Sequence, residues 1–258
     1  MSVNIDDRAV VRKGAELDDG VSVGPFSVIG ENVTIGRDTV IGSSVLIDGN
    51  TGIGSNNEIF HCASIGTPPQ DLKYCGEETS VKIGNNNTIR EFVTVNSATG
   101  EGESTVVGDN CLLMAYVHIA HNCVLEDNIV LANAVNLAGH VKIYYHAIIG
   151  GMVPVHQFVA IGDHAFVGGG SRIAKDVPPF VKVAGNPPRV NGINSIGLQR
   201  RGFTKKQREV IKRAYTYLYR KGLNVSQAVE RIQSDLARTK ETRLIVDFIE
   251  NCQRGITK

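Results

Sequence analysis

The 258-residue sequence predicts a fold of the all-β plus α class, with a prism of short parallel strands followed by a helical domain. Three observations support this prediction: an aliphatic residue recurs at every sixth position, the recurrence ends near Val177-Pro178-Pro179, and helical patterns follow Asn186-Pro187-Pro188. We therefore expect a β-domain over residues 1–188 and a C-terminal α-helical domain over residues 189–258.

The six-residue period runs from Ile5 to Ile173, and Val, Ile or Leu occupies 26 of its 29 positions. A period of six fits neither an isolated amphipathic helix nor an ordinary alternating strand. It fits a short strand plus a turn, with one aliphatic side chain per hexad pointing into a shared interior. Three hexads then make one triangular coil, and successive coils stack as parallel strands about 4.8 Å apart.

The three exceptions to the period are Asp71, Glu77 and Glu101. They fall in Gly66–Ser80 and Asn96–Ser104, which we expect to be loops extending from the prism. Loops on a rigid scaffold often carry function, although both segments could also be tolerated insertions.

Composition limits the class of protein. The net charge of +1 argues against a nucleic-acid partner, and the acidic start MSVNIDDRAV is unlike a signal peptide. The sequence has no apolar run of the ~18 residues that a membrane span needs. Its five cysteines form no C-x-x-C pair, which favours buried free thiols in a reducing compartment. We therefore expect a cytoplasmic protein.

The C-terminal region differs in charge from the rest of the chain. Residues 200–258 hold 15 Lys and Arg against 6 Asp and Glu, whereas residues 1–199 hold 12 against 20. Helices are expected from the Thr204 cap to about Arg220, around Val225–Leu236 and around Leu244–Ile249. The basic surface suggests an acidic partner or a phosphate-bearing ligand, or it is only a solvated face.

The histidines suggest where chemistry could occur. In an 18-residue coil, His121, His140 and His156 fall at nearly the same point of three consecutive coils, and His118 lies close to them. His146 and His164 stack at another point and are expected to be structural.

Two chemistries could use such a stack of imidazoles. Zinc would need three ligands and an open position, and the spacing of these histidines does not reproduce that of the zinc-binding hexapeptide proteins. General-base catalysis needs one neutral imidazole oriented by a partner, and Asn122 beside His121 suits that role. We expect neither a metal nor a cofactor.

Five stretches of sequence resemble the cytoplasmic UDP-N-acetylglucosamine acyltransferase family over nearly the whole chain. They are Gln70-Asp71-Leu72-Lys73-Tyr74, His118-Ile119-Ala120-His121, Leu137-Ala138-Gly139-His140, Val155-His156-Gln157-Phe158 and Arg200-Arg201-Gly202-Phe203. The resemblance implies a left-handed parallel β-helix of hexapeptide repeats and a homotrimer with sites between neighbouring prisms. It also implies transfer of an (R)-3-hydroxyacyl chain from acyl carrier protein to the 3-hydroxyl of UDP-N-acetylglucosamine, the first step toward lipid A.

The same resemblance implies roles for single residues. His121 corresponds to the general base, and the Gly139 N–H corresponds to a donor for the oxyanion. The remaining residues correspond to substrate contacts: a loop from the adjacent subunit (Gln70, Asp71, Lys73), the sugar or acyl cleft (His118, His140, His156, Gln157), the nucleotide end (Asn194, Arg200, Arg201) and the acyl-length region (Phe166, Gly169). The basic C-terminal domain would contact the acidic acyl carrier protein as well as the nucleotide.

Two residues depart from the family pattern. Asn122 stands where the family usually has Asp after the catalytic histidine, and Asn96 stands where many members have His. An amide can orient the imidazole but cannot stabilise its charge, so acylation of a 3-amino analogue of the sugar is an alternative. A later N-acyltransferase of the same pathway and a non-enzymatic β-helix scaffold are less favoured alternatives.

Overall fold

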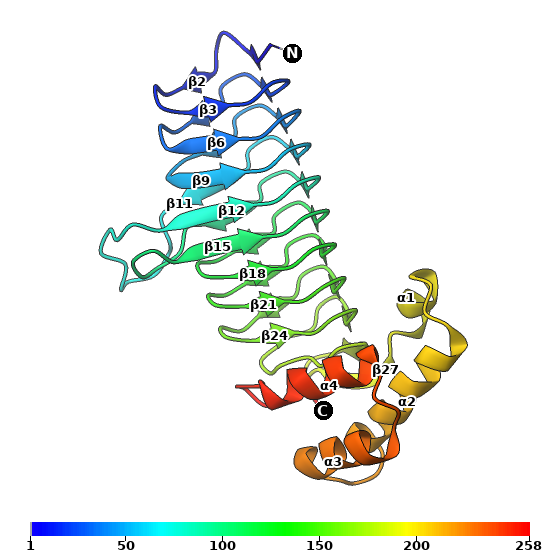
Figure 1. Ribbon diagram of the computed structural model, residues 1–258. Coiled ribbons are helices and arrows are strands. Elements are labelled where there is room, and N and C mark those ends of the chain that lie inside the picture. The colour runs from blue at the N-terminus through cyan, green and yellow to red at the C-terminus, as the bar shows by residue number, and fades with distance from the viewer. Residues whose placement is uncertain (1) are drawn as a thin grey trace.

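The computed structural model describes residues 2–258, and in that part of the chain it contains 27 strands and four helices. The strands form the stacked prism that the hexads predict, wound as the left-handed parallel β-helix that the resemblance implies. The helices gather at the end opposite the N-terminus (Figure 1). Three sheets form the three faces of the prism.

Sheet 1 has eleven strands, all parallel except for the last pair. In spatial order they are β1 (Asn4–Ile5), β4 (Ser22–Val23), β7 (Val40–Ile41), β10 (Glu58–Ile59), β13 (Thr88–Ile89), β16 (Leu112–Leu113), β19 (Val130–Leu131), β22 (Ile148–Ile149), β25 (Phe166–Val167), β26 (Val181–Ala184) and β27 (Arg189–Ile193).

Sheets 2 and 3 have eight parallel strands each. Sheet 2 consists of β2 (Val10–Val11), β5 (Val28–Ile29), β8 (Leu46–Ile47), β11 (Ser64–Thr67), β14 (Thr94–Asn96), β17 (His118–Ile119), β20 (Asn136–Leu137) and β23 (Pro154–Val155). Sheet 3 consists of β3 (Glu16–Leu17), β6 (Val33–Ile35), β9 (Asn50–Ile53), β12 (Ser80–Ile83), β15 (Ser104–Val107), β18 (Val124–Leu125), β21 (Lys142–Ile143) and β24 (Ala160–Ile161).

The strand register confirms the 18-residue coil and locates the two loops. Most paired strands are offset by 18 residues, as Asn4 and Ser22 are. The offset rises to 30 between β9 and β12, where Asn50 pairs with Ser80, and to 24 between β12 and β15. The two insertions therefore add about two hexads and one hexad, which leaves the six-residue phase intact beyond them.

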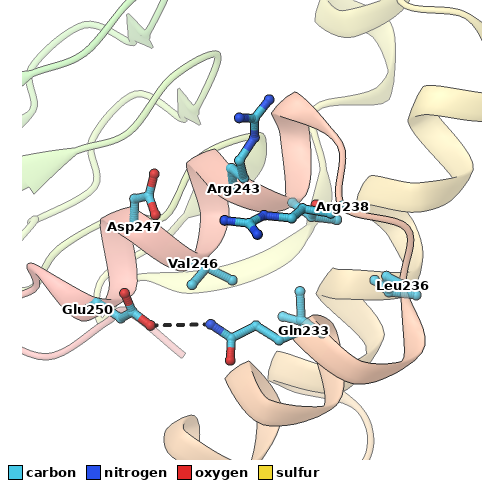
Figure 2. A pocket seen from close by; sticks show the side chains of 9 residues that line it. Gln233, Leu236, Arg238, Arg243, Val246, Asp247 and Glu250 are labelled. Carbon is cyan, nitrogen blue, oxygen red and sulfur yellow. Dashed lines mark hydrogen bonds between the residues drawn. The ribbon is translucent and has the colours of Figure 1, made fainter.

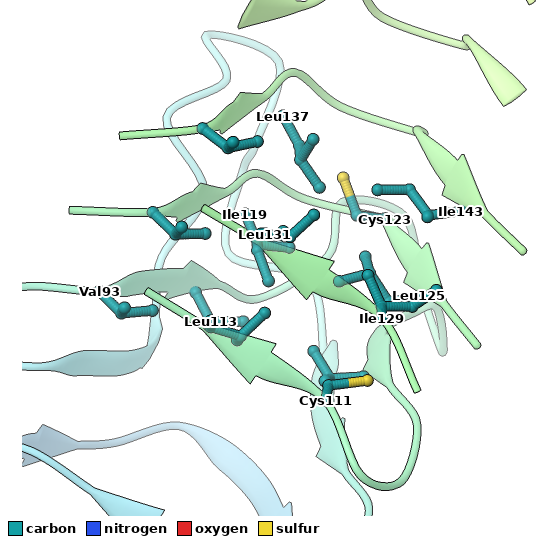
Figure 3. Close-up of a cluster of buried hydrophobic side chains, with 14 of the residues drawn as sticks. Val93, Cys111, Leu113, Ile119, Cys123, Leu125, Ile129, Leu131, Leu137 and Ile143 are labelled. Carbon is teal, nitrogen blue, oxygen red and sulfur yellow. The ribbon is translucent and has the colours of Figure 1, made fainter. Parts of the chain in front are cut away.

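The interior of the prism is a column of aliphatic side chains (Figure 3). The hexad positions from Val23 to Ile173 supply one layer of it, except for the three acidic positions. A second layer comes from the residue two positions earlier in each hexad, where Cys111, Val117 and Cys123 are buried. The N-terminal coil closes the column poorly, since Ile5 is 43% exposed.

Most corners of the prism are tight turns whose second residue has a left-handed backbone. Asn122, His140 and Phe158 have φ angles of 58°, 60° and 64° in three consecutive coils. Three edges follow from these corners: the loop edge between sheets 2 and 3 (residues 121–122, 139–140, 157–158 and both loops), the helix edge between sheets 3 and 1 (145–146, 163–164), and the aromatic edge between sheets 1 and 2 (115–116, 133–134, 151–152).

The C-terminal helices are α1 (Ser195–Arg200), α2 (Lys205–Tyr219), α3 (Val225–Asp235) and α4 (Lys240–Glu250). The last three confirm the expected helices, and Thr204 caps α2 as expected, whereas α1 was not foreseen. In the described part of the chain, none of these helices is long and apolar enough to cross a membrane.

The chain end returns to the last coil of the prism. Buried Asp176 accepts hydrogen bonds from Cys252 Sγ at 2.8 Å and, at its carbonyl, from Thr257 N at 2.7 Å. β27 pairs with β26, so this sheet continues past residue 188. The domain boundary at 188/189 stays a prediction.

The five cysteines are free, but only Cys111 and Cys123 are buried. Cys62 and Cys75 are exposed, so the expectation of five buried thiols was wrong. Cys62 sits at a corner turn and Cys75 in the first loop, neither of which faces the interior.

Candidate active site

The loop edge brings together a column of rings around His121. The His121 and His140 rings meet edge to face with centroids 5.2 Å apart, and His140 stacks on Phe158 at 4.6 Å. The third ring of the column is thus Phe158, and the prediction that His156 completes it was wrong. His156 comes two residues before the left-handed corner position, is exposed, and has its Nδ1 3.1 Å from the carbonyl oxygen of Gln157.

Gly139 lies directly against the His121 ring. A Cβ built on Gly139 would collide with the ring carbons and nitrogens of His121, including Nε2. The absence of a side chain at 139 therefore allows the imidazole to lie over the backbone of the next coil. The Gly139 N–H makes no hydrogen bond within the described residues and is free to donate.

The Nδ1 side of His121 faces an amide. His121 Nδ1 lies 2.9 Å from Asn122 Oδ1, and His121 as a whole is buried, with 7% of its surface exposed. Asn122 is itself tied to the second loop, because its Oδ1 accepts the Thr99 N–H at 2.9 Å and its Nδ2 donates to Thr99 O at 3.1 Å.

The Nε2 side of His121 faces the first loop. Asp71 Oδ2 lies 3.7 Å from Nε2 of the same chain, with a quarter of the Asp71 side chain exposed. The resemblance had implied that this loop reaches a neighbouring subunit, but Asp71 faces the His121 of its own chain. Its neighbours Gln70 and Lys73 are exposed beside it.

The other two histidines near this point, His118 and His140, both have lowered pKa values. His118, on β17, shares a 2.7 Å hydrogen bond with Thr94 Oγ1, and burial lowers the pKa of His118. Burial also lowers the pKa of His140, and the adjacent His121 lowers it further. Both imidazoles are therefore neutral near physiological pH and can donate one hydrogen bond and accept another.

Two of the three residues expected at the nucleotide end, Asn194 and Arg201, contact the helix edge, and Arg200 is exposed next to Arg201. Asn194 Nδ2 donates to the carbonyl of His164 at 3.0 Å, and Arg201 Nη1 lies 3.5 Å from His164 Nδ1. Burial, with the charge of Arg201, lowers the pKa of His164 to about 3. His146 stacks on His164 at 5.2 Å, so this second pair of histidines has polar neighbours that the sequence pattern did not reveal.

The two residues expected to set acyl length lie elsewhere again. Phe166 is on β25, and Gly169 begins the corner turn of the aromatic edge in the same coil. A Cβ on Gly169 would come 3.1 Å from the Gly151 carbonyl oxygen of the coil below. The expected site residues of one chain are thus distributed over all three edges of the prism.

A separate hollow of about 360 Å³ lies between α3 and α4 (Figure 2). Arg238 and Arg243 line it together with Asp247, and Gln233 donates to Glu250 across it at 3.4 Å. It carries mixed charge and belongs to the helical domain.

Comparison with known proteins gives consistent matches along the chain. The family described as UDP N-acetylglucosamine O-acyltransferase, domain 2, matches residues 176–257, and bacterial transferase hexapeptide repeats match residues 14–49 and 104–139. The acyl-[acyl-carrier-protein]–UDP-N-acetylglucosamine O-acyltransferase of Trichlorobacter lovleyi is 53% identical over 99% of this chain and 100% of its own. That of Paracidovorax citrulli is 52% identical over 99% of both chains.

Solved structures agree. The UDP-N-acetylglucosamine acyltransferase of Francisella novicida superposes with a TM-score of 0.95 at 44% identity, covering 98% of this chain and 93% of its own. The UDP-N-acetylglucosamine O-acyltransferase of Moraxella catarrhalis superposes with a TM-score of 0.96 at 41% identity, covering 98% and 99%.

Proposed function

Because the chain belongs to the UDP-N-acetylglucosamine O-acyltransferase family, we propose that it transfers an (R)-3-hydroxyacyl chain from acyl carrier protein to the 3-hydroxyl of UDP-N-acetylglucosamine. This is the first step of lipid A biosynthesis, and we infer that the protein acts in the cytoplasm. The observation that carries the proposal is the arrangement of His121, with an amide at Nδ1, a carboxylate near Nε2 and the backbone of Gly139, whose N–H is free, against the ring.

This arrangement supports acyl transfer by general-base catalysis. His121 Nε2 takes the proton of the sugar 3-hydroxyl as its oxygen attacks the thioester carbonyl carbon, a step to which a positioned base contributes ~10²–10⁴-fold. The carbonyl oxygen becomes an oxyanion that the Gly139 N–H stabilises. The tetrahedral intermediate collapses by breaking the C–S bond, and the carrier thiolate receives the proton from the imidazolium.

Neighbouring side chains suit substrate binding. Asp71 with Gln70 and Lys73 would contact sugar hydroxyls and phosphate. His118, His140, His156 and Gln157 would line the sugar and acyl cleft. At the nucleotide end, Arg200 and Arg201 would bind phosphate with Asn194 beside them, since a guanidinium matches phosphate oxygens in pairs.

A homotrimer would bring these groups together. One chain carries His121 on the loop edge, the arginines on the helix edge and Gly169 on the aromatic edge. These groups are too dispersed to form one site in a single chain. If parallel prisms pack edge to edge, each chain would complete the site of a neighbouring chain. The exposed aromatic side chains of Phe92 and Tyr116, stacked at 4.9 Å on the aromatic edge, are suited to such contact.

The names of the relatives specify O-acyl transfer, which favours the hydroxyl acceptor over the 3-amino analogue. The excess of nine positive charges over residues 200–258 suits an acidic protein partner, and acyl carrier protein is the partner that the names contain. The catalytic part would then be the prism, and the helical domain would contact the carrier and the nucleotide.

One assay tests this function. The purified protein is given UDP-N-acetylglucosamine or its 3-amino analogue with acyl carrier proteins loaded with 3-hydroxy chains of graded length, and products are identified by mass. We expect a 3-O-acylated product, loss of turnover in His121→Ala, and retained turnover in Arg37→Ala, an exposed residue of an N-terminal coil. Full activity of His121→Ala would show that His121 is not the general base. If the protein acylates neither sugar nucleotide, the proposed function is refuted.

A further inference from the structure

Glu77 joins the two loops that flank His121. Its Oε1 accepts the Gly100 N–H of the second loop at 3.0 Å, and its Oε2 accepts the Cys75 N–H of its own loop at 2.8 Å. These backbone donors, Gly100 first, lower the pKa of the Glu77 carboxyl. A charged carboxylate is needed here, because both partners donate and an amide would present a nitrogen to one of them.

Thr99, the residue before Gly100, joins the second loop to Asn122 at the corner that carries His121. Thr99 uses both backbone groups on Asn122, with its N–H donating to Oδ1 and its carbonyl accepting from Nδ2. The Thr99 hydroxyl donates to the same Oδ1 at 3.1 Å.

This double contact fixes the orientation of the Asn122 amide. In the flipped orientation the amide nitrogen would face the Thr99 N–H and the amide oxygen would face the Thr99 carbonyl, so both hydrogen bonds would be lost. With Oδ1 therefore next to His121 Nδ1, the hydrogen bond between them exists only when Nδ1 carries the proton. The lone pair is then on Nε2, which lies against Gly139 and 3.7 Å from Asp71.

We propose that Glu77 is a positioning residue for His121, because it holds the second loop against Asn122 and thereby keeps the imidazole in the Nδ1–H form. The inference rests on the proposed role of His121 as the base. Without the Glu77 tie, the second loop keeps backbone hydrogen bonds such as Ser97 N–H to the Thr67 carbonyl and Gly102 N–H to the Glu78 carbonyl, but Thr99 is held less firmly against Asn122. The Asn122 amide can then turn in part of the molecules. There His121 takes the Nε2–H form, which the Asp71 carboxylate favours and which cannot accept the proton of the sugar hydroxyl. The wrong tautomer of a catalytic histidine is costly to turnover.

The test compares Glu77→Gln with Glu78→Gln. Glu78 is the exposed next residue, and its side chain receives the same change of charge without contributing to this network. Nitrogen-15 spectra of histidine-labelled full-length protein report the tautomer of His121, assigned by comparison with His121→Ala. We expect Nδ1–H in the wild type and in Glu78→Gln, and a mixture of both forms in Glu77→Gln.

Kinetics should follow the spectra. We expect kcat of Glu77→Gln to fall about tenfold while KM for the sugar nucleotide changes less than about twofold, because ground-state binding is preserved. Glu77→Asp, which keeps the carboxylate on a shorter stem, should restore part of kcat and of the Nδ1–H signal, and it replaces Glu77→Gln if that variant does not fold.

Three results would overturn the proposal: an Nε2–H wild-type His121, a Glu77→Gln spectrum with the same Nδ1–H population as the wild type, or a changed tautomer with unchanged kcat. The spectra need no substrate. A correct tautomer pattern in a protein that acylates neither sugar would therefore refute the proposed function while confirming the positioning by Glu77.

Discussion

Residue 122 shows how one amide serves two neighbours. Its oxygen accepts from His121 and Thr99, and its nitrogen donates to the Thr99 carbonyl. An aspartate at this position could accept the same hydrogen bonds but could not donate to Thr99. Asparagine at position 122 therefore adds a hydrogen bond to the second loop that the aspartate of the family pattern could not donate.

We expect Asn122→Asp to move the pH dependence of kcat/KM. A carboxylate beside Nδ1 favours the charged imidazolium, which cannot act as a base, so the pH below which activity is lost should rise. The control is Asn128→Asp, because Asn128 also has a left-handed backbone, at a corner of the helix edge. A profile identical to that of the wild type would show that Oδ1 is not the partner of His121.

Gly139 is needed for the space that it leaves, since its φ angle is not in the left-handed region. Gly139→Ala should displace the His121 ring and lower kcat by ~10²-fold, the scale of a misplaced catalytic group, with little effect on thermal stability. Gly52→Ala is the control: the φ angle of Gly52 is also outside the left-handed region, and a Cβ there would meet only Thr34 Oγ1, at an ordinary contact distance of 3.4 Å. Equal activities of the two variants would contradict this reading of the site.

At the scale of the element, most hexads contribute a two-residue strand whose stability comes from the coils above and below it. Isolated strands of this length would not form, and so the buried aliphatic side chain is the main source of stability. The contribution should depend on where the coil lies in the stack, because terminal coils have one neighbour instead of two.

Leu131→Ala and Ile5→Ala change the same hexad position in an inner and an outer coil. Leu131 is completely buried, so its loss should cost about 2–5 kcal/mol, the usual range for a buried leucine. Ile5 is 43% exposed, and its loss should cost about 1 kcal/mol or less. Denaturant unfolding of both variants checks this, and equal losses would mean that the outer coil packs as tightly as the inner one.

The hexads could be predicted from sequence because the period is an integer number of residues and the two insertions preserve it. The helix α1 could not, since it has six residues, contains Gly197, and is signalled only by its cap at Asn194. The contact of Asp71 with His121 depends on loop hydrogen bonds that no pattern reveals. The prediction for His156 was wrong because His156 comes two residues before the corner position of its coil. The residue at that corner is Phe158, and its ring stacks on His140.

At the scale of the whole molecule, acid should weaken the fold. Burial lowers the pKa values of His118, His140, His146 and His164, that of His164 to about 3, from an ordinary value of 6.5. The unfolded chain therefore binds protons that the folded chain does not, and stability is complete above pH 6.5 and decreases as pH falls through that value. Thermal midpoints between pH 7.5 and 5 should show this decrease, and it should be shallower in His164→Gln; a flat profile would contradict it.

The distribution of site residues over three edges predicts complementation between subunits. His121→Ala and the double variant Arg200→Ala/Arg201→Ala should each be nearly inactive. After joint unfolding and reassembly, mixed oligomers should regain activity, because some sites combine an intact base with intact arginines from different chains. Analytical ultracentrifugation checks that the reassembled protein is a trimer. If reassembled trimers regain no activity, His121 and the two arginines act in a site formed by one chain.

The open N-terminal coil has a mechanical consequence. Among residues 2–258 no helix covers the first coil, so a force applied to it should detach one coil at a time. Each 18-residue coil would lengthen the chain by ~60 Å. The two coils that carry the loops would release 30 and 24 residues, or ~100 Å and ~80 Å, and the carboxylate tie between the loops resists their separation. In a single-molecule stretching experiment, two longer extension steps would therefore identify the coils whose loops flank His121.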